Sequence, residues 1–107
     1  MPTISIIMPR LGVVPLPKIF KYGRYSIFFW SNENDEPVHV HIAIGNMTSN
    51  ATKIWLTSAG GCLLAHNKSR IPQKNLNNLL KVIQIEHPVI LEKWKSYFDT
   101  DDIKFYC

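Results

Sequence analysis

Two histidines stand two residues apart in a short apolar stretch, where residues 37–42 read PVHVHI. In a β-strand, residues i and i+2 project from the same face, about 6.5 Å apart. His39 and His41 would therefore form the polar face of an amphipathic strand. Converging neutral imidazoles are ligands for a divalent transition metal such as zinc, and a histidine pair can also transfer protons near neutral pH. The pair therefore predicts a metal half-site, a catalytic pair, or two hydrogen-bonded structural histidines.

A zinc ion needs more ligands than this pair supplies. The acids Glu33, Asp35 and Glu36 precede the pair in a polar loop, and Cys62 and His66 occur in a later apolar segment. By alternation, Cys62 and His66 would share one face of a strand. None of these spacings is an established zinc motif. The sequence thus predicts no cofactor beyond a divalent metal such as zinc, held by the histidine pair.

Basic residues form a second candidate surface. The chain has a net charge of +4, and residues 66–81 contain lysines and an arginine but no acid. Lys53, Lys68 and Arg70 would contact an acidic partner, or the phosphates of RNA, if the fold brings them near the histidines. The alternative is an ordinary solvated surface. The sequence contains no Ser–His–Asp order, phosphate-binding glycine loop or nucleotide-binding fingerprint.

The elements that must position these residues follow from the hydrophobic periodicity. Runs rich in β-branched and aromatic residues predict strands at 3–8, within 18–32, and at 38–44, 52–56 and 62–66. Apolar residues between positions 76 and 98 recur every three or four residues, which is helical spacing. Because Pro88 interrupts this stripe, we expect two helices at 73–86 and 88–98, or one helix kinked near His87. The tail would add an edge strand or fray.

Strands come first and helices last, which is typical of an α+β fold. We expect a single domain over residues 1–107, with a small antiparallel sheet of four to five strands and the C-terminal helices packed on one face. An aromatic cluster would form core or stack on RNA bases, and it comprises Phe28, Phe29, Trp30 and Trp55. No apolar run reaches the roughly 18 residues of a membrane span, and no signal peptide is evident. We therefore expect a cytoplasmic protein that does not contact a membrane.

The residues around the histidine pair resemble a known prokaryotic family, domain of unknown function 4160. The matching segments are Met1–Thr3, Phe28–Asn32, the motif at 37–42, Lys53–Leu56 and Trp94–Phe98. Together they extend over most of residues 1–98. The chain departs from the family pattern at Val38, where a second proline is usual, at Pro88, in residues 9–17 and in the tail.

The resemblance implies a small bacterial protein from a two-gene cassette of suspected toxin–antitoxin type. Its partner would be a small cognate protein from that cassette, with RNA as a further candidate. We therefore expect an interaction module of toxin–antitoxin type whose functional face carries His39 and His41. One alternative is a metal-dependent or histidine-based hydrolase acting on RNA, with the same two residues as catalytic groups. Another is a binding domain with structural histidines. The resemblance does not decide whether the protein is an enzyme.

Overall fold

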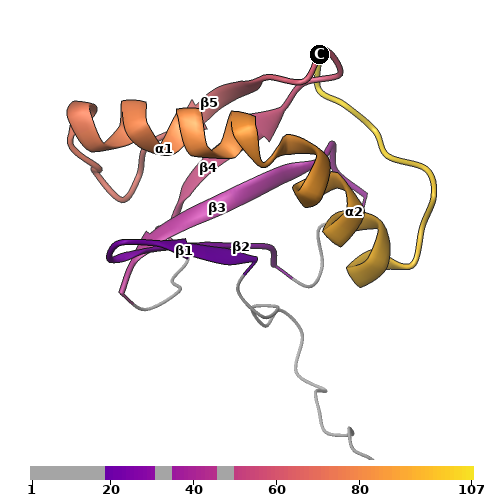
Figure 1. Ribbon diagram of the computed structural model, residues 1–107, viewed down its shortest axis with the longest axis horizontal. Helices are drawn as coiled ribbons and strands as arrows, with labels where there is room; N and C mark the ends of the chain where they lie inside the picture. The colour runs from indigo at the N-terminus through magenta and orange to yellow at the C-terminus, as the bar shows by residue number, and fades with distance from the viewer. Residues whose placement is uncertain (1–18, 31–34, 46–49) are drawn as a thin grey trace, which may run out of the picture.

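A computed structural model describes residues 19–30, 35–45 and 50–107 of the chain. Within them lie five strands and two helices (Figure 1). The strands are β1 (Phe20–Tyr22), β2 (Tyr25–Phe28), β3 (His39–Ile44), β4 (Thr52–Leu56) and β5 (Cys62–His66), and the helices are α1 (Gln73–Ile85) and α2 (His87–Phe98). The expected strand at 3–8 and the proline-rich segment at 9–17 lie outside the described residues.

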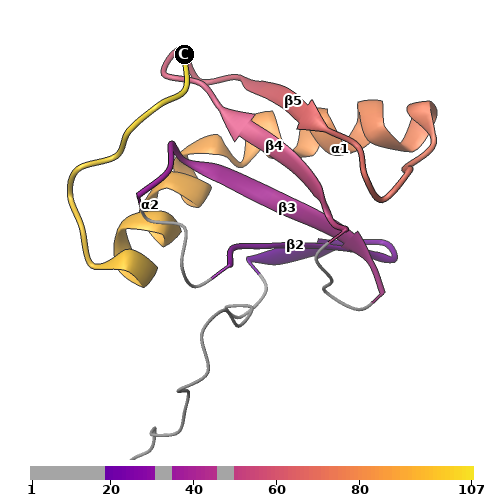
Figure 2. The ribbon, with the colours of Figure 1, turned by 180° about the vertical axis from the view of Figure 1, so that it is seen from behind.

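The five strands form one antiparallel sheet in sequence order, β1-β2-β3-β4-β5. Both helices lie on the same side of this sheet, as the front and back views show (Figures 1 and 2). The predicted α+β class, with C-terminal helices on one face of a small antiparallel sheet, is confirmed. None of the described helices is long and apolar enough to cross a membrane.

The segment at 18–32 was expected to contain one strand, but it forms a hairpin. Tyr22 pairs with Tyr25 across a two-residue turn at Gly23 and Arg24. Gly23 has a φ of 61°, a left-handed conformation that glycine adopts without the strain a Cβ would cause. The segments before and after the turn are similarly rich in aromatic and β-branched residues. The sequence pattern therefore shows no break at the turn.

The stripe of helical residues is divided into two helices at Glu86, whose φ and ψ are −88° and 6°. Pro88 lies in the first turn of α2, where its missing N–H does not interrupt a helical hydrogen bond. The buried ring of His87 fixes this junction, because its Nε2–H donates to the carbonyl oxygen of Thr57 at 2.8 Å. His87 therefore attaches the start of α2 to the turn that follows β4.

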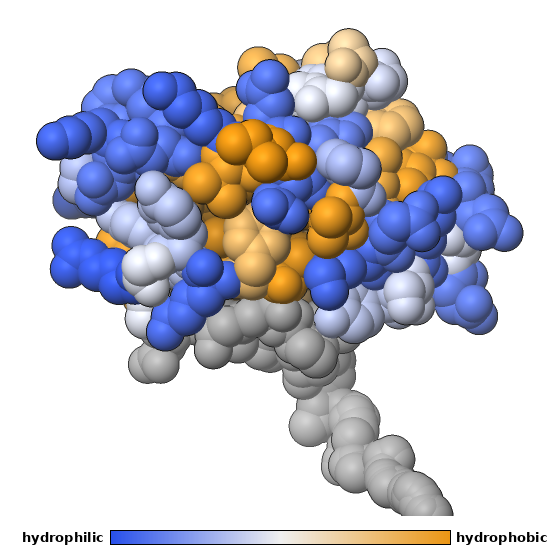
Figure 3. Space-filling view, in the orientation of Figure 1, coloured by the Kyte–Doolittle hydropathy of each residue, from blue (hydrophilic) through white to orange (hydrophobic). Residues whose placement is uncertain are grey.

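The main hydrophobic core lies between the helices and the sheet. It contains buried residues from strands and helices alike: Ile27, Val40, Ile42, Ile54, Leu56, Leu76, Leu79, Ile83, Ile90 and Trp94. Successive strand residues alternate between the two faces, so the same strands direct the residues between these positions to the opposite side. Figure 3 shows hydrophobic side chains between the hydrophilic surfaces of the helices. The histidine pair belongs to the opposite side.

Candidate functional site

A row of side chains crosses four strands on the side of the sheet opposite the helices. Phe28 of β2 pairs with His41 of β3, His41 pairs with Lys53 of β4, and Lys53 pairs with His66 of β5. Residues directly opposite each other on antiparallel strands have Cβ atoms about 5 Å apart. We call these four residues the His row. It places a lysine between two imidazoles.

His66 reaches this row because of a β-bulge in β5. Lys53 pairs with His66, but Ile54 pairs with Leu64, so Ala65 has no residue opposite it. A bulge of one residue reverses which face the following side chain occupies. The prediction that Cys62 and His66 share a face is therefore wrong.

Cys62 lies on the helix side instead. Its thiol donates to the carbonyl oxygen of Leu80 in α1 at 3.4 Å. Burial raises the pKa of the Cys62 thiol, which keeps it in the protonated donor form. Cys62 is therefore not positioned to bind a ligand together with the histidine pair, since the sheet separates them.

His39 is completely buried at the start of β3. Its Nδ1–H donates to the carbonyl oxygen of Pro37 at 2.8 Å. This hydrogen bond orients the ring and leaves Nε2 as the lone-pair atom of the neutral imidazole, as in histidines that bind metals. The ring centroid lies 5.5 Å from that of Trp55 and 5.6 Å from that of Trp94, which belongs to α2.

His41 lies two residues after His39 on β3 and is only 7 % exposed. Its ring centroid is 4.9 Å from that of His39, with the two rings nearly perpendicular. Phe28 and Trp30 contact its other sides, at 5.6 and 6.2 Å between centroids. The pair was expected to form the polar face of the strand, and it does project away from Val40. That face is nevertheless buried and largely aromatic around the two rings.

Lys53 has two close interactions of its own. Its Nζ donates to Oε1 of Glu36 at 2.7 Å, and it lies 4.3 Å from the centroid of the Trp55 ring. The Trp55 ring also stacks with that of Tyr106, at 4.9 Å between centroids and an interplanar angle of 5°. Lys53 is thus held by an acid and an aromatic ring, and Glu36, one of the expected metal-ligand candidates, is engaged with it.

The pKa of His66 is lowered from its usual value. Burial contributes most, and the positive charges of Lys68, His41 and Lys53 add to it. Each of these effects disfavours a protonated ring. His66 therefore carries a neutral imidazole, which lies opposite Lys53 at the β5 end of the His row.

Lys68 and Arg70 lie in the loop that connects β5 to α1. The Asn67 side chain fixes this loop: its Oδ1 accepts hydrogen bonds from the Ile71 N–H at 3.0 Å and from the Thr52 hydroxyl at 2.7 Å. Arg70 has a φ of 58°, which is unusual for a residue other than glycine or asparagine. The structure thus brings Lys68 near His66, whose Nδ1 accepts a hydrogen bond from the Lys68 N–H at 3.4 Å, while Arg70 follows in the same short loop.

Among the described residues, His39 and His41 form at most half of the predicted metal site. Within residues 19–30, 35–45 and 50–107, no group of three or more His, Cys, Asp or Glu side chains is arranged to hold a metal ion. Asp35 is exposed, and Glu33 lies outside the described residues. His39 and His41 remain adjacent imidazoles that could hold an ion together with ligands from elsewhere.

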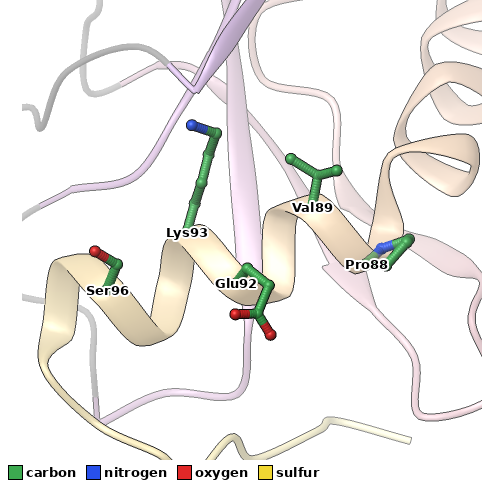
Figure 4. A pocket seen from close by; sticks show the side chains of 5 residues that line it. All are labelled: Pro88, Val89, Glu92, Lys93 and Ser96. Carbon is green, nitrogen blue, oxygen red and sulfur yellow. The ribbon is translucent and has the colours of Figure 1, made fainter.

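Hollows on the molecular surface occur away from this row. One of about 440 Å³ is lined by Pro88, Val89, Glu92, Lys93 and Ser96, all from α2 (Figure 4). Another of about 460 Å³ is lined by Gly60, Lys81, Gln84 and Ile85, at the end of α1. The first combines two apolar residues with an acid and a base that point in different directions, so it does not resemble a catalytic pocket.

The sequence offered His66 as a further candidate beside the pair, but it did not reveal the bulge that turns His66 to their side, the contact of Lys53 with Glu36, or the stacking of Tyr106 on Trp55. The bulge at Ala65 carries no glycine that would have indicated it. The other two contacts join segments that are distant along the chain. Only the alternation of residues 38–42 signalled the site, and it identified His39 and His41 correctly as neighbours.

Comparison with known proteins gives a family but no described relative. A family model with the description "Domain of unknown function (DUF4160)" matches residues 25–95. These residues include every member of the His row and most of α2. No curated protein and no solved structure matches the chain significantly.

Proposed function

Because the chain belongs to the DUF4160 family, we propose that it is an interaction module of toxin–antitoxin type, which binds a small cognate protein in the bacterial cytoplasm. We treat residues 1–107 as one domain. The observation that favours binding over catalysis is the burial of the histidine pair among aromatic rings. His39 is 0 % exposed and His41 is 7 % exposed, so neither ring is presented to a substrate in this structure.

The partner would contact the partly exposed residues that surround the pair. Trp55 is half-buried, Leu63 lies opposite it on β5 and is 45 % exposed, and Tyr106 is 59 % exposed. We call the two aromatic residues, Trp55 and Tyr106, the aromatic rim. Tryptophan and tyrosine are enriched at protein interfaces because they bury a large area with few rotatable bonds. In this proposal His39 and His41 hold the sheet face in shape, while the aromatic rim makes the contact.

The test is co-purification of the tagged chain with the protein encoded beside its gene. We expect Tyr106→Ala to reduce the recovered partner at least tenfold, because interface aromatics are frequent binding hot spots. Tyr22→Ala is the matched control, since Tyr22 is 41 % exposed on β1, at the other edge of the sheet. An equal loss for both variants, or no complex with the unmodified chain, would contradict the proposal.

A second candidate function is a hydrolase acting on RNA. It is favoured by one arrangement, the two imidazoles of His41 and His66 on either side of Lys53. A neutral imidazole can accept a proton, and a nearby ammonium group can stabilise a phosphate. His39 and His41 would be the catalytic or zinc-binding residues in this alternative. Lys53, Lys68 and Arg70 would contact the RNA.

Incubation of the purified chain with single-stranded RNA tests this second candidate, with and without added zinc. A hydrolase should lose cleavage in the His41→Asn variant while its circular dichroism spectrum stays unchanged. Cleavage that survives this substitution would indicate a contaminating nuclease. Bound zinc that is lost in a double His39→Asn/His41→Asn variant would support the metal-dependent form.

A further inference from the structure

The outer edge of β5 is open for strand pairing. β5 is the last strand of the sheet and pairs only with β4 among the described residues. Both views of the ribbon show no other described segment beyond it (Figures 1 and 2). The edge of a sheet presents backbone N–H and C=O groups that lack a neighbouring strand. A peptide in extended conformation can pair with them.

The side chains of this edge include no proline, lysine, arginine or acid, and its one protective feature against strand addition is the bulge at Ala65, after the two leucines. Natural edge strands commonly carry charged residues or proline, or are very short. β5 reads CLLAH over five residues, and its leucines are 45 % and 39 % exposed at Leu63 and Leu64. The opposite edge, β1, has three residues and includes Lys21. The two edges therefore differ in length, charge and exposed apolar area.

The surroundings of the β5 edge are basic. α1 packs against β5, and the thiol of Cys62 donates a hydrogen bond to the carbonyl oxygen of Leu80 in this helix. Residues 62–85, which make up β5, the loop and α1, include Lys68, Arg70, Lys74 and Lys81 and no acid. Figure 3 shows the resulting hydrophilic surface over α1. A ligand on this edge would lie beside positive charge along its length.

We infer that β5 accepts an extended, acidic segment of the partner protein as a sixth strand. Main-chain hydrogen bonds would provide affinity, and the alternating apolar side chains, which share one face of the added strand, would contact Leu64. A second copy of β5 is a poorer occupant, because it would bring two sets of lysine and arginine side chains together. This inference rests on the proposed function, since it specifies how the cognate protein is held.

The backbone conformation of Arg70 makes it possible to remove the charge of this residue without straining the loop. Its φ of 58° is a conformation in which glycine would avoid steric strain. Arg70→Gly therefore removes the guanidinium group without a conformational penalty in the folded state. This variant tests the basic surroundings while it preserves the fold.

The experiment uses the full chain and a synthetic peptide of sequence EVEIEVE, blocked at both ends. Titration by calorimetry gives the affinity, and hydrogen exchange measured by NMR identifies the protected amides. We expect binding accompanied by slower exchange of the β5 amides, and no binding of the basic peptide KVKIKVK. Equal binding of both peptides, or protection on another element, would overturn the inference.

Two variants provide matched controls. Leu64→Asn removes an apolar contact from the edge, and we expect it to weaken the peptide about tenfold or more. Val89→Asn changes a residue of similar exposure, 44 %, on α2 and should leave the affinity unchanged. Arg70→Gly should weaken binding severalfold and reduce its dependence on salt. Loss of affinity in Val89→Asn but not in Leu64→Asn would contradict the β5 assignment.

The complex with the cognate protein tests strand addition at β5 separately from the proposed function as an interaction module. A stable complex in which the β5 amides exchange as in the free chain would refute strand addition and leave the interaction module intact. Absence of any complex would refute the proposed function itself. Displacement of the peptide by RNA at low salt, without protection of β5, would replace the acidic segment with nucleic acid as the ligand of the basic surroundings.

Discussion

The two sides of this sheet are both buried, but they are built from different residues. On the helix side, Val40, Ile42 and Ile54 pack against α1 and α2 in an apolar core. On the other side, the same strands bury His39 and His41 together with Phe28. Burying an imidazole costs free energy that an aliphatic side chain does not cost. The comparison indicates that the helix side is stabilised by aliphatic packing, while the His side depends on the hydrogen bonds and ring contacts of its imidazoles.

The largest expected effect lies on the helix side. Trp94→Ala would remove a ring that is 1 % exposed and contacts Phe29, Phe98 and His39. We expect a loss of about 3–5 kcal/mol in the free energy of unfolding, because a large cavity would remain. Urea unfolding followed by circular dichroism measures it. If Trp94→Ala lowered the free energy of unfolding by less than a substitution on the His side does, the His side would be the larger source of stability, contrary to this comparison.

A smaller loss is expected from His39→Ala. This change would remove the hydrogen bond to the Pro37 carbonyl and leave that acceptor buried, at a cost of about 1–3 kcal/mol in the free energy of unfolding. His39→Asn is the control, since an amide nitrogen can replace Nδ1 as the donor. Equal destabilisation by both variants would show that ring packing, not the hydrogen bond, is the main contribution of His39.

The next prediction concerns pH. Because the pKa of His66 is lowered in the folded protein from 6.5, the unfolded chain binds more protons as the pH falls below about 7. The contribution of His66 to stability is therefore present above pH 6.5 and decreases as the pH falls through the folded-state pKa. The free energy of unfolding, measured from pH 7.5 to 5, should fall less steeply in His66→Gln than in the unmodified chain. Parallel curves would show that the ring has the same pKa in both states.

The smallest effect is expected from the ion pair of the His side. Glu36→Gln would weaken the contact with Lys53, but the Glu36 side chain is 43 % exposed. We expect a decrease of less than about 1 kcal/mol in the free energy of unfolding, and a smaller one in high salt. A loss comparable to that of His39→Ala would mean that the pair holds Lys53 against Trp55 and thereby organises the whole row.

Much of the fold could be predicted from local pattern. The strands at 52–56 and 62–66 and the division of the helices near Pro88 follow from alternation, helical spacing and proline chemistry, and the structure has them at these places. The β1–β2 hairpin was missed because Gly23 was the only signal within an otherwise continuous aromatic and β-branched run. Local composition identifies an extended segment more easily than a reversal within it.

Less of the candidate site could be predicted. Alternation placed His39 and His41 on one side of β3, but it could not show what surrounds that side. The burial of both rings depends on Phe28, Trp30 and Trp55, which come from other strands or their ends. The position of His66 depends on the register between β4 and β5, which a single extra residue changes. These are long-range properties that no window of the sequence contains.

The bulge at Ala65 has a genetic consequence. His66 faces Lys53 although β5 has one residue more than the register with β4 requires. Deleting the codon for Ala65 would restore regular alternation and place the histidine directly after Leu64, so the imidazole would still lie opposite Lys53, now without a bulge. Among proteins related to this one, the length of the segment between the second glycine of the β4–β5 turn and this histidine would therefore report on the presence of the bulge, and a histidine one residue nearer to that glycine would occupy the same place in the His row.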